Sequence, residues 1–314
     1  MKFSFTMSNF QHISVLLNEA IDALNIQPTG IYVDGTFGRG GHSSEILKKI
    51  ESGHLISIDR DPAAKQCAEE KFKGNSHFSF YAGCMSEIKN AVAQSGFEKV
   101  DGVLLDIGVS SPQLDDADRG FSFMKDGPLD MRMNPEMGMS AADWVAESSF
   151  ETMASVFREF GEEKFSGRIA NHIIKSRDIA PITTTHQLAA IIAEAVPFKD
   201  KHKHPATRVF QAIRIAVNEE LTELSKTLEA AYSMLKPGGR LVVISFHSLE
   251  DRIVKNFMNY YAKPKDLMPD LPVAQFVEAP TLKLISKPVK ASDEESLNNP
   301  RARSAIMRIA EKLP

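Results

Sequence analysis

The 314-residue sequence has little of several features that mark particular protein classes. It has only two cysteines, Cys67 and Cys84, without metal-ligand spacing around them, so we expect neither a disulfide scaffold nor a metal site. Its longest apolar runs, such as residues 241–246, are far shorter than the roughly 20 residues that span a bilayer. The first residues carry no apolar stretch of signal-peptide length. These absences predict a cytoplasmic protein without a membrane partner.

Positive charge is not in excess either. The chain has 37 lysines and arginines against 41 aspartates and glutamates, a formal net charge of −4. This balance argues against nucleic-acid binding by the whole surface, but it allows a local basic patch. Because 43% of the residues are hydrophobic and glycine and proline are few, a folded protein is expected rather than a disordered chain.

Strand and helix patterns alternate in the first third of the chain. Strands are predicted at residues 31–34, 54–59, 77–81 and 101–106. Alternation of this kind produces right-handed crossovers and a parallel sheet with helices on both faces. The predicted fold class is therefore α/β.

The alternation is interrupted in the middle of the chain. From about residue 113 to residue 205 helical periodicity replaces the strand pattern, and Thr184 with Gln187 forms a candidate capping box. A single long amphipathic helix is then predicted from Thr207 to Leu235, followed by a buried strand. We predict a core formed by residues 1–112 and 206–314, with a helical insertion at residues 113–205.

A glycine-rich loop follows the first predicted strand, with the sequence DGTFGRGGH at residues 34–42. Glycines allow close approach of the backbone to a ligand, and the next helix offers free N–H groups at its start. Asp59 ends the next strand, where nucleotide-binding folds place an acid that binds ribose hydroxyls. Together these features indicate a cofactor with an adenosine moiety.

The identity of that cofactor depends on two residues. The fingerprint for NAD, G-x-G-x-x-G, would need glycine where Ser43 stands. Asp34 is unfavourable beside a pyrophosphate but suits a cationic or zwitterionic ligand such as S-adenosylmethionine. A nicotinamide-dependent dehydrogenase is the less favoured alternative. Asp106 ends the fourth strand, so it should face the same crevice as Asp34 and Asp59.

Long segments of the chain resemble the MraW/RsmH family, bacterial S-adenosylmethionine-dependent 16S ribosomal RNA (cytosine-N4-)methyltransferases. The resemblance runs from about His12 to the C-terminus. Its motifs are HISVLLNEAI, DGTFGRGGHS, IDRDP, LLDIGVSSPQLD, RVFQAIRIAVNEEL, LKPGGRLVVISFHSLEDRIVK and NPRARSAIMRIAE.

The resemblance implies a Rossmann-like methyltransferase core with a helical substrate-recognition insertion. The implied substrate is the N4 amine of one cytidine in the decoding region of 16S rRNA, within the small ribosomal subunit. Met85 stands where relatives often carry an aromatic residue. The cofactor contacts implied by the resemblance are Gly40, Gly41, His42, Asp59, Met85, Asp106 and Gln113. Asp34 and Gly38 are added to this set from the glycine-rich loop itself.

The cytosine amine is a poor nucleophile because its lone pair is conjugated with the ring, so an acceptor near it should assist the reaction. The candidates are Asp106 and Ser111, the latter in the Ser110-Ser111 turn. Alternatively, Asp106 only binds the cofactor and the serines shape the turn. The base should stack on an aromatic residue. The candidates for stacking are Phe121, Phe123 and Phe246.

Basic residues provide candidate RNA contacts, although charge runs often form only a solvated surface. Residues 115–134 could form a lid over the flipped base. A non-catalytic assembly factor with a nucleotide-binding fold is a second alternative, and the sequence allows a homodimer. The candidate RNA-binding residues are Arg208, His247, Arg252, Arg301 and Arg303, with Lys199, Lys201 and Lys203 beside Arg208.

Overall fold

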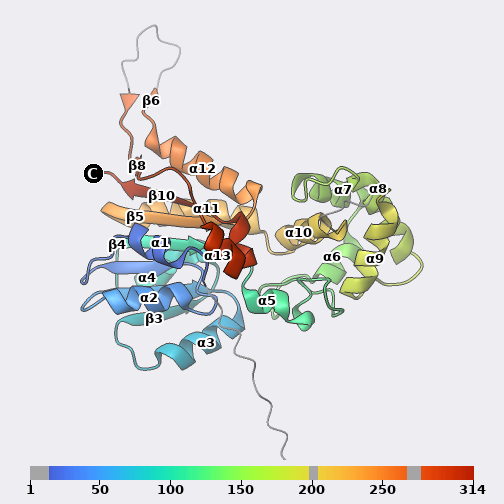
Figure 1. Ribbon diagram of the computed structural model, residues 1–314, viewed down its shortest axis with the longest axis horizontal. Coiled ribbons are helices and arrows are strands. Elements are labelled where there is room, and N and C mark those ends of the chain that lie inside the picture. Colours follow the sequence, from blue (N-terminus) through green and yellow to red (C-terminus); the bar gives the residue numbers. More distant parts are fainter. Residues whose placement is uncertain (1–13, 198–203, 267–276) are drawn as a thin grey trace, which may run out of the picture.

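The computed structural model describes residues 14–197, 204–266 and 277–314 (Figure 1). Its central sheet has the strand order β3-β2-β1-β4-β5-β10-β8. The first five of these strands are parallel, whereas β10 runs antiparallel to β5 and also pairs with β8 and β9. The α/β class with a mostly parallel sheet is therefore confirmed. The strands are β1 (Ile31–Asp34), β2 (His54–Asp59), β3 (Phe78–Ala82), β4 (Val100–Asp106), β5 (Leu235–Ser245), β8 (Leu282–Leu284), β9 (Val289–Lys290) and β10 (Ile306–Lys312), with a separate antiparallel pair β6 (Lys265–Asp266) and β7 (Val277–Glu278).

Helices cover both faces of the sheet because its inner strands are apolar on both sides. Val103 and Leu105 of β4 face a core with α4, α11 and α12, whereas Leu104 faces α1 and α2. α3 packs near the β2–β3 edge beside Phe37. These helices are α1 (Leu17–Ala23), α2 (Gly41–Lys49), α3 (Pro62–Phe72), α4 (Ile88–Gln94), α11 (Glu220–Met234) and α12 (Ser248–Ala262), and α13 (Asp293–Asn298) precedes β10.

The middle of the chain forms a second lobe of helices (Figure 1). Thr184 and Gln187 form the predicted capping box at the start of α9. The lobe has a core of its own, which includes Phe157, Ile192 and, from α10, Ile213. Packing thus continues past residue 205, and we propose that the insertion extends to residue 217. Its helices are α5 (Ser111–Asp115), α6 (Ala141–Glu147), α7 (Phe150–Glu159), α8 (Ser166–Arg177), α9 (Thr185–Ala195) and α10 (Ala206–Val217).

The prediction of a single helix between Thr207 and Leu235 is wrong. The segment forms two helices, α10 and α11, separated by Asn218 and by Glu219, which has a left-handed backbone (φ 51°). The Asn218 amide donates to the Met131 carbonyl (2.7 Å) and accepts from the Met133 N–H (2.8 Å). The chain therefore turns where Asn218 holds the insertion loop, although the apolar spacing continues across the break.

Candidate active site

A cavity of about 330 Å³ lies at the carboxyl ends of the parallel strands. Open α/β sheets bind their ligands at this edge. The segments that line it lie at the carboxyl ends of four neighbouring strands: residues 35–39 at β1, 59–61 at β2, 83–85 at β3 and 106–111 at β4. Phe246, after β5, and Arg301, in the short 3₁₀ helix Pro300–Ser304, also line the cavity, as do residues of the insertion and the start of α11 such as Met133, Arg214 and Glu220.

The glycine loop approaches its neighbours too closely for larger residues. Gly40, at the start of α2, has a left-handed backbone (φ 69°), and a Cβ there would lie 2.7 Å from the Phe37 ring. At Gly41 a Cβ would lie 1.9 Å from Ser14 Oγ. Gly38, Gly41 and His42 line the cavity, whereas Gly40 is not among its lining residues and shapes the turn instead.

Asp34 lies beneath the loop, not in the cavity wall. Its buried carboxylate accepts hydrogen bonds from Ser43 Oγ (2.6 Å) and from the Thr36 N–H (3.2 Å). Ser43 also bonds to Ser57 (2.8 Å). The residue that breaks the NAD fingerprint therefore has a structural use, because its hydroxyl holds Asp34. Burial raises the pKa of Asp34.

Asp59 connects the loop to the end of β2. Its carboxylate accepts the N–H groups of Gly38 (2.8 Å) and Asp61 (2.9 Å) and lines the cavity. Desolvation, which outweighs these two hydrogen bonds, raises the pKa of Asp59 to about 6. Since a carboxylate has about four acceptor positions, Asp59 can still bind hydroxyl donors of a ligand.

Asp61 ties the same strand end to the insertion. It accepts from Gln113 Nε2 (2.8 Å) and forms an ion pair with Arg119 Nη1 (2.9 Å). Gln113 lines the cavity and also accepts the Ser110 N–H, while Arg119 donates to the Met133 carbonyl (2.9 Å). Part of the predicted lid at residues 115–134 is thereby attached to the end of β2. Sequence reasoning missed Arg119, because no pattern joins it to an aspartate 58 residues earlier.

Asp106 is the most unusual carboxylate of the site. Its Oδ2 lies 3.6 Å from His42 Nδ1, and its buried Oδ1 has no hydrogen-bond partner among the described residues. Burial raises the pKa of Asp106 well above its usual range, and the charges of Asp34 and Glu250 add to the effect. Because Asp106 lines the cavity, the wall holds a carboxylate with a raised pKa.

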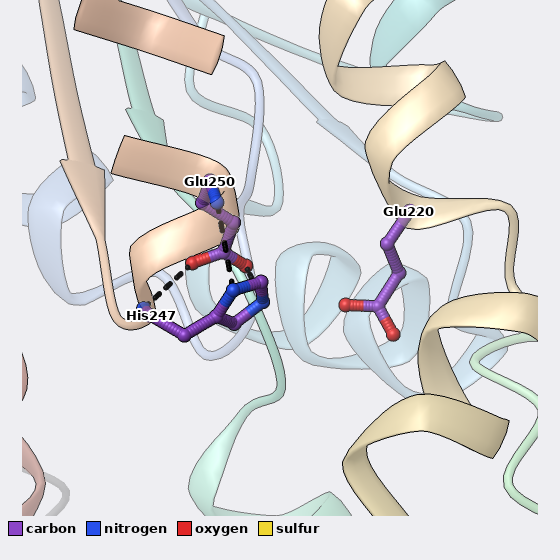
Figure 2. A group of neighbouring side chains, drawn as sticks. All are labelled: Glu220, His247 and Glu250. Carbon is purple, nitrogen blue, oxygen red and sulfur yellow. Dashed lines mark hydrogen bonds and ion pairs between the residues drawn. The ribbon is translucent and has the colours of Figure 1, made fainter. Parts of the chain in front are cut away.

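A cluster of charged side chains lies between the start of α12, just after β5, and the start of α11 (Figure 2). His247 caps α12, and Glu250 Oε2 accepts the N–H groups of Phe246 (2.8 Å) and His247 (3.2 Å). His247 Nε2 lies 3.0 Å from Glu250 Oε1. Glu220, His247 and Glu250 have possible ligand atoms within 4.8 Å of one another. Both Glu220 oxygens already bond to Arg214, so a cation of the protein itself balances this cluster.

The other predicted residues differ in their surroundings. Met85 and Ser111 line the cavity, and so does Phe246. Phe121 and Phe123 instead pack in the core of the insertion. The stacking role of Phe246 and the catalytic role of Ser111 stay predictions.

The predicted RNA contacts do not form one group. Arg301 lines the cavity but is paired with Asp115 (2.9 Å). His247 is a helix cap, and Arg252 lies on the surface, 3.7 Å from Glu162. Arg208 and Arg303 are exposed. Their contacts with RNA stay predictions, and Lys199, Lys201 and Lys203 lie outside the described residues.

Within the described ranges, the helices are all too short or too polar to cross a membrane.

Comparisons with known proteins place the chain in a family. The model of the MraW methylase family matches residues 9–313. A relative from Alteromonas mediterranea, named ribosomal RNA small subunit methyltransferase H, is 54% identical over 98% of this chain and 99% of its own length. A relative of the same name from Thioalkalivibrio sulfidiphilus is 52% identical, over 96% and 97%. The resemblance seen in the motifs is thus confirmed, and with it S-adenosylmethionine as the cofactor. Because these matches run through nearly the whole chain, the protein belongs to the MraW methylase family.

Proposed function

We propose that this protein methylates the N4 amine of a cytidine in the decoding region of 16S rRNA, within the small ribosomal subunit. The single observation that carries the proposal is the largely desolvated carboxylate of Asp106, which lies in the wall of the cavity at the strand ends. The names of the relatives support an rRNA substrate. The motif resemblance supports the cytidine N4 amine.

The residues around the cavity fit S-adenosylmethionine, which carries positive charge on its sulfonium and its ammonium group. Three carboxylates with raised pKa values lie in or beneath the wall, and a cation would offset their unfavourable burial. Asp59 would bind the ribose hydroxyls, and Met85 would form an apolar wall for the adenine. When bound, S-adenosylmethionine supplies the methyl group and keeps the electron pair of the broken sulfur–carbon bond, leaving the methylated amine one proton to lose.

Asp106 would receive that proton. The Asp106 side chain lines the cavity, so its carboxylate can accept a hydrogen bond from the amine, which favours the shift of the nitrogen lone pair towards the methyl carbon. Phe246 lies beside Gly108, where a Cβ would lie 3.6 Å from the ring, so this aromatic face flanks the loop that follows Asp106. We propose that the cytosine base stacks on Phe246.

Cofactor binding should weaken in acid. Asp59 has a pKa of about 6 without ligand, so it becomes neutral as the pH falls through 6 and accepts hydrogen bonds from the ribose hydroxyls less strongly. We expect Kd for S-adenosylmethionine to rise by about tenfold per pH unit below pH 6 if one proton competes with the ligand. Calorimetric titration from pH 5 to 8 measures this. In the Asp59→Asn variant, Kd should depend less steeply on pH. If its Kd depends on pH as steeply as that of the wild type, the competing proton binds to another group.

The proposed reaction can be tested with small ribosomal subunits from cells that lack this enzyme. We expect the purified protein to transfer label from methyl-labelled S-adenosylmethionine to 16S rRNA. Nuclease digestion and mass spectrometry should then find N4-methylcytidine at one position in the decoding region. Methylation at carbon 5, or of another base, would overturn the N4 assignment. Binding without transfer would favour the assembly factor.

A further inference from the structure

Helix α8 carries a row of positive side chains on its outer face. Lys164, in the turn before the helix, and Arg168 and Lys175 within it are all exposed. Within the helix, the spacing of seven residues places Arg168 and Lys175 on one side, and Lys164 lies just before the N-cap Phe165. Residues 164–177 contain no acidic residue, although the whole chain has a net charge of −4. No ion pair joins these three side chains to a carboxylate in the part of the chain that the structure describes.

Helix stability explains only one residue of this row. Lys175 lies in the last turn of α8, where a cation is favourable, but Lys164 and Arg168 lie at the N-terminal end, where positive charge is unfavourable. Arg177 shows what a structural cation does here, because its guanidinium donates to the carbonyls of Val145 (2.6 Å) and Ser148 (2.7 Å). The row of Lys164, Arg168 and Lys175 makes no comparable contact among the described residues.

The row begins next to the catalytic core. In the turn before α8, Glu162 accepts a hydrogen bond from Ser248 Oγ (3.3 Å) and lies 3.7 Å from Arg252. Both partners belong to the first turns of α12, which follows Phe246 in the cavity wall. Figure 1 shows the start of α12 facing the helical lobe. Gly161 packs against the backbone of Arg208, which adds another exposed cation close by.

We propose that the outer face of α8, through Lys164, Arg168 and Lys175, binds backbone phosphates of the RNA that carries the target base. This inference rests on the proposed rRNA substrate. Arg168 and Lys175 are roughly 10 Å apart along the helix axis, so they would contact different phosphates. Such contacts carry no sequence information; they hold the RNA while the base enters the cavity.

The test is the salt dependence of binding to isolated small ribosomal subunits. In the triple variant Lys164→Gln/Arg168→Gln/Lys175→Gln, the slope of log K against log salt should become shallower by about 2–3, as expected for the loss of three phosphate contacts. Its affinity for S-adenosylmethionine and its melting temperature should stay unchanged. The matched control is Lys73→Gln/Lys89→Gln/Lys283→Gln, which removes three exposed lysines from the surface of the methyltransferase core and should keep the wild-type slope.

An unchanged slope in the α8 variant would overturn the proposal, and so would an equal change in the control. A loss of affinity for subunits but not for protein-free 16S rRNA would assign α8 to a ribosomal protein, which also overturns it. The assay measures binding and not methyl transfer. If the wild-type protein transfers no methyl group but the α8 variant shows the shallower slope, the proposed reaction fails while the α8 surface stands.

Discussion

Replacing Asp106 by asparagine is expected to lower kcat for methyl transfer by about 10²–10⁴-fold, the range that a positioned proton acceptor contributes. Asparagine has nearly the same shape, so the buried site should keep its packing. It cannot take up the proton that the methylated amine must lose. Single-turnover rates with saturating cofactor and small subunits measure the effect on the chemical step.

Two measurements separate this role from simple cofactor binding. The affinity of the Asp106→Asn variant for S-adenosylmethionine, measured by calorimetry, should change far less than kcat. Asp101→Asn is the matched control, because Asp101 lies at the other end of β4, where it pairs with Lys236, and kcat should stay close to wild type. Near-normal kcat with weak cofactor binding in Asp106→Asn would instead support the alternative that Asp106 only binds the cofactor.

The sequence predicted the cavity through a rule of topology. Asp59 and Asp106 end parallel strands, and the carboxyl ends of such strands meet at one edge of the sheet. Strand patterns are local, so both residues could be assigned to the same crevice without coordinates. The rule does not say where a carboxylate points. Asp34 ends a strand of the same sheet, but its side chain turns towards Ser43, under the loop.

Contacts between distant segments could not be predicted. Arg119 pairs with Asp61, and Asn218 holds the backbone of Met131 and Met133, but neither partnership leaves a local pattern. The helix break at Asn218 was missed for the same reason, since apolar residues keep a helical spacing on both sides of it. The basic residues of α8 can be read directly from the sequence. Their shared face and their place beside α12 required the structure.

Replacing Asp59 by alanine is expected to weaken the binding of S-adenosylmethionine by about 1–3 kcal/mol, roughly a factor of 5 to 150 in Kd. The variant loses the acceptor for the ribose hydroxyls and also the anchor for the Gly38 and Asp61 N–H groups. Titration calorimetry at pH 7.5 measures the change. An unchanged Kd would remove Asp59 from the cofactor site.

Measurements of thermal stability on variants of Asp59 show whether the lower affinity comes from a lost contact with the cofactor or from a disordered glycine-rich loop. Burial raises the pKa of Asp59 to about 6, so its contribution to the free energy of unfolding is present at low pH and is lost as the pH rises through 6. Asp59→Asn removes the buried charge and keeps one acceptor oxygen. Relative to wild type, the ligand-free melting temperature of this variant should therefore rise between pH 5 and pH 7.5, while its Kd stays above the wild-type value. A relative melting temperature that falls over this range would mean that the ionised carboxylate stabilises the ligand-free loop. The weaker binding would then reflect a disordered loop rather than a lost contact with the cofactor.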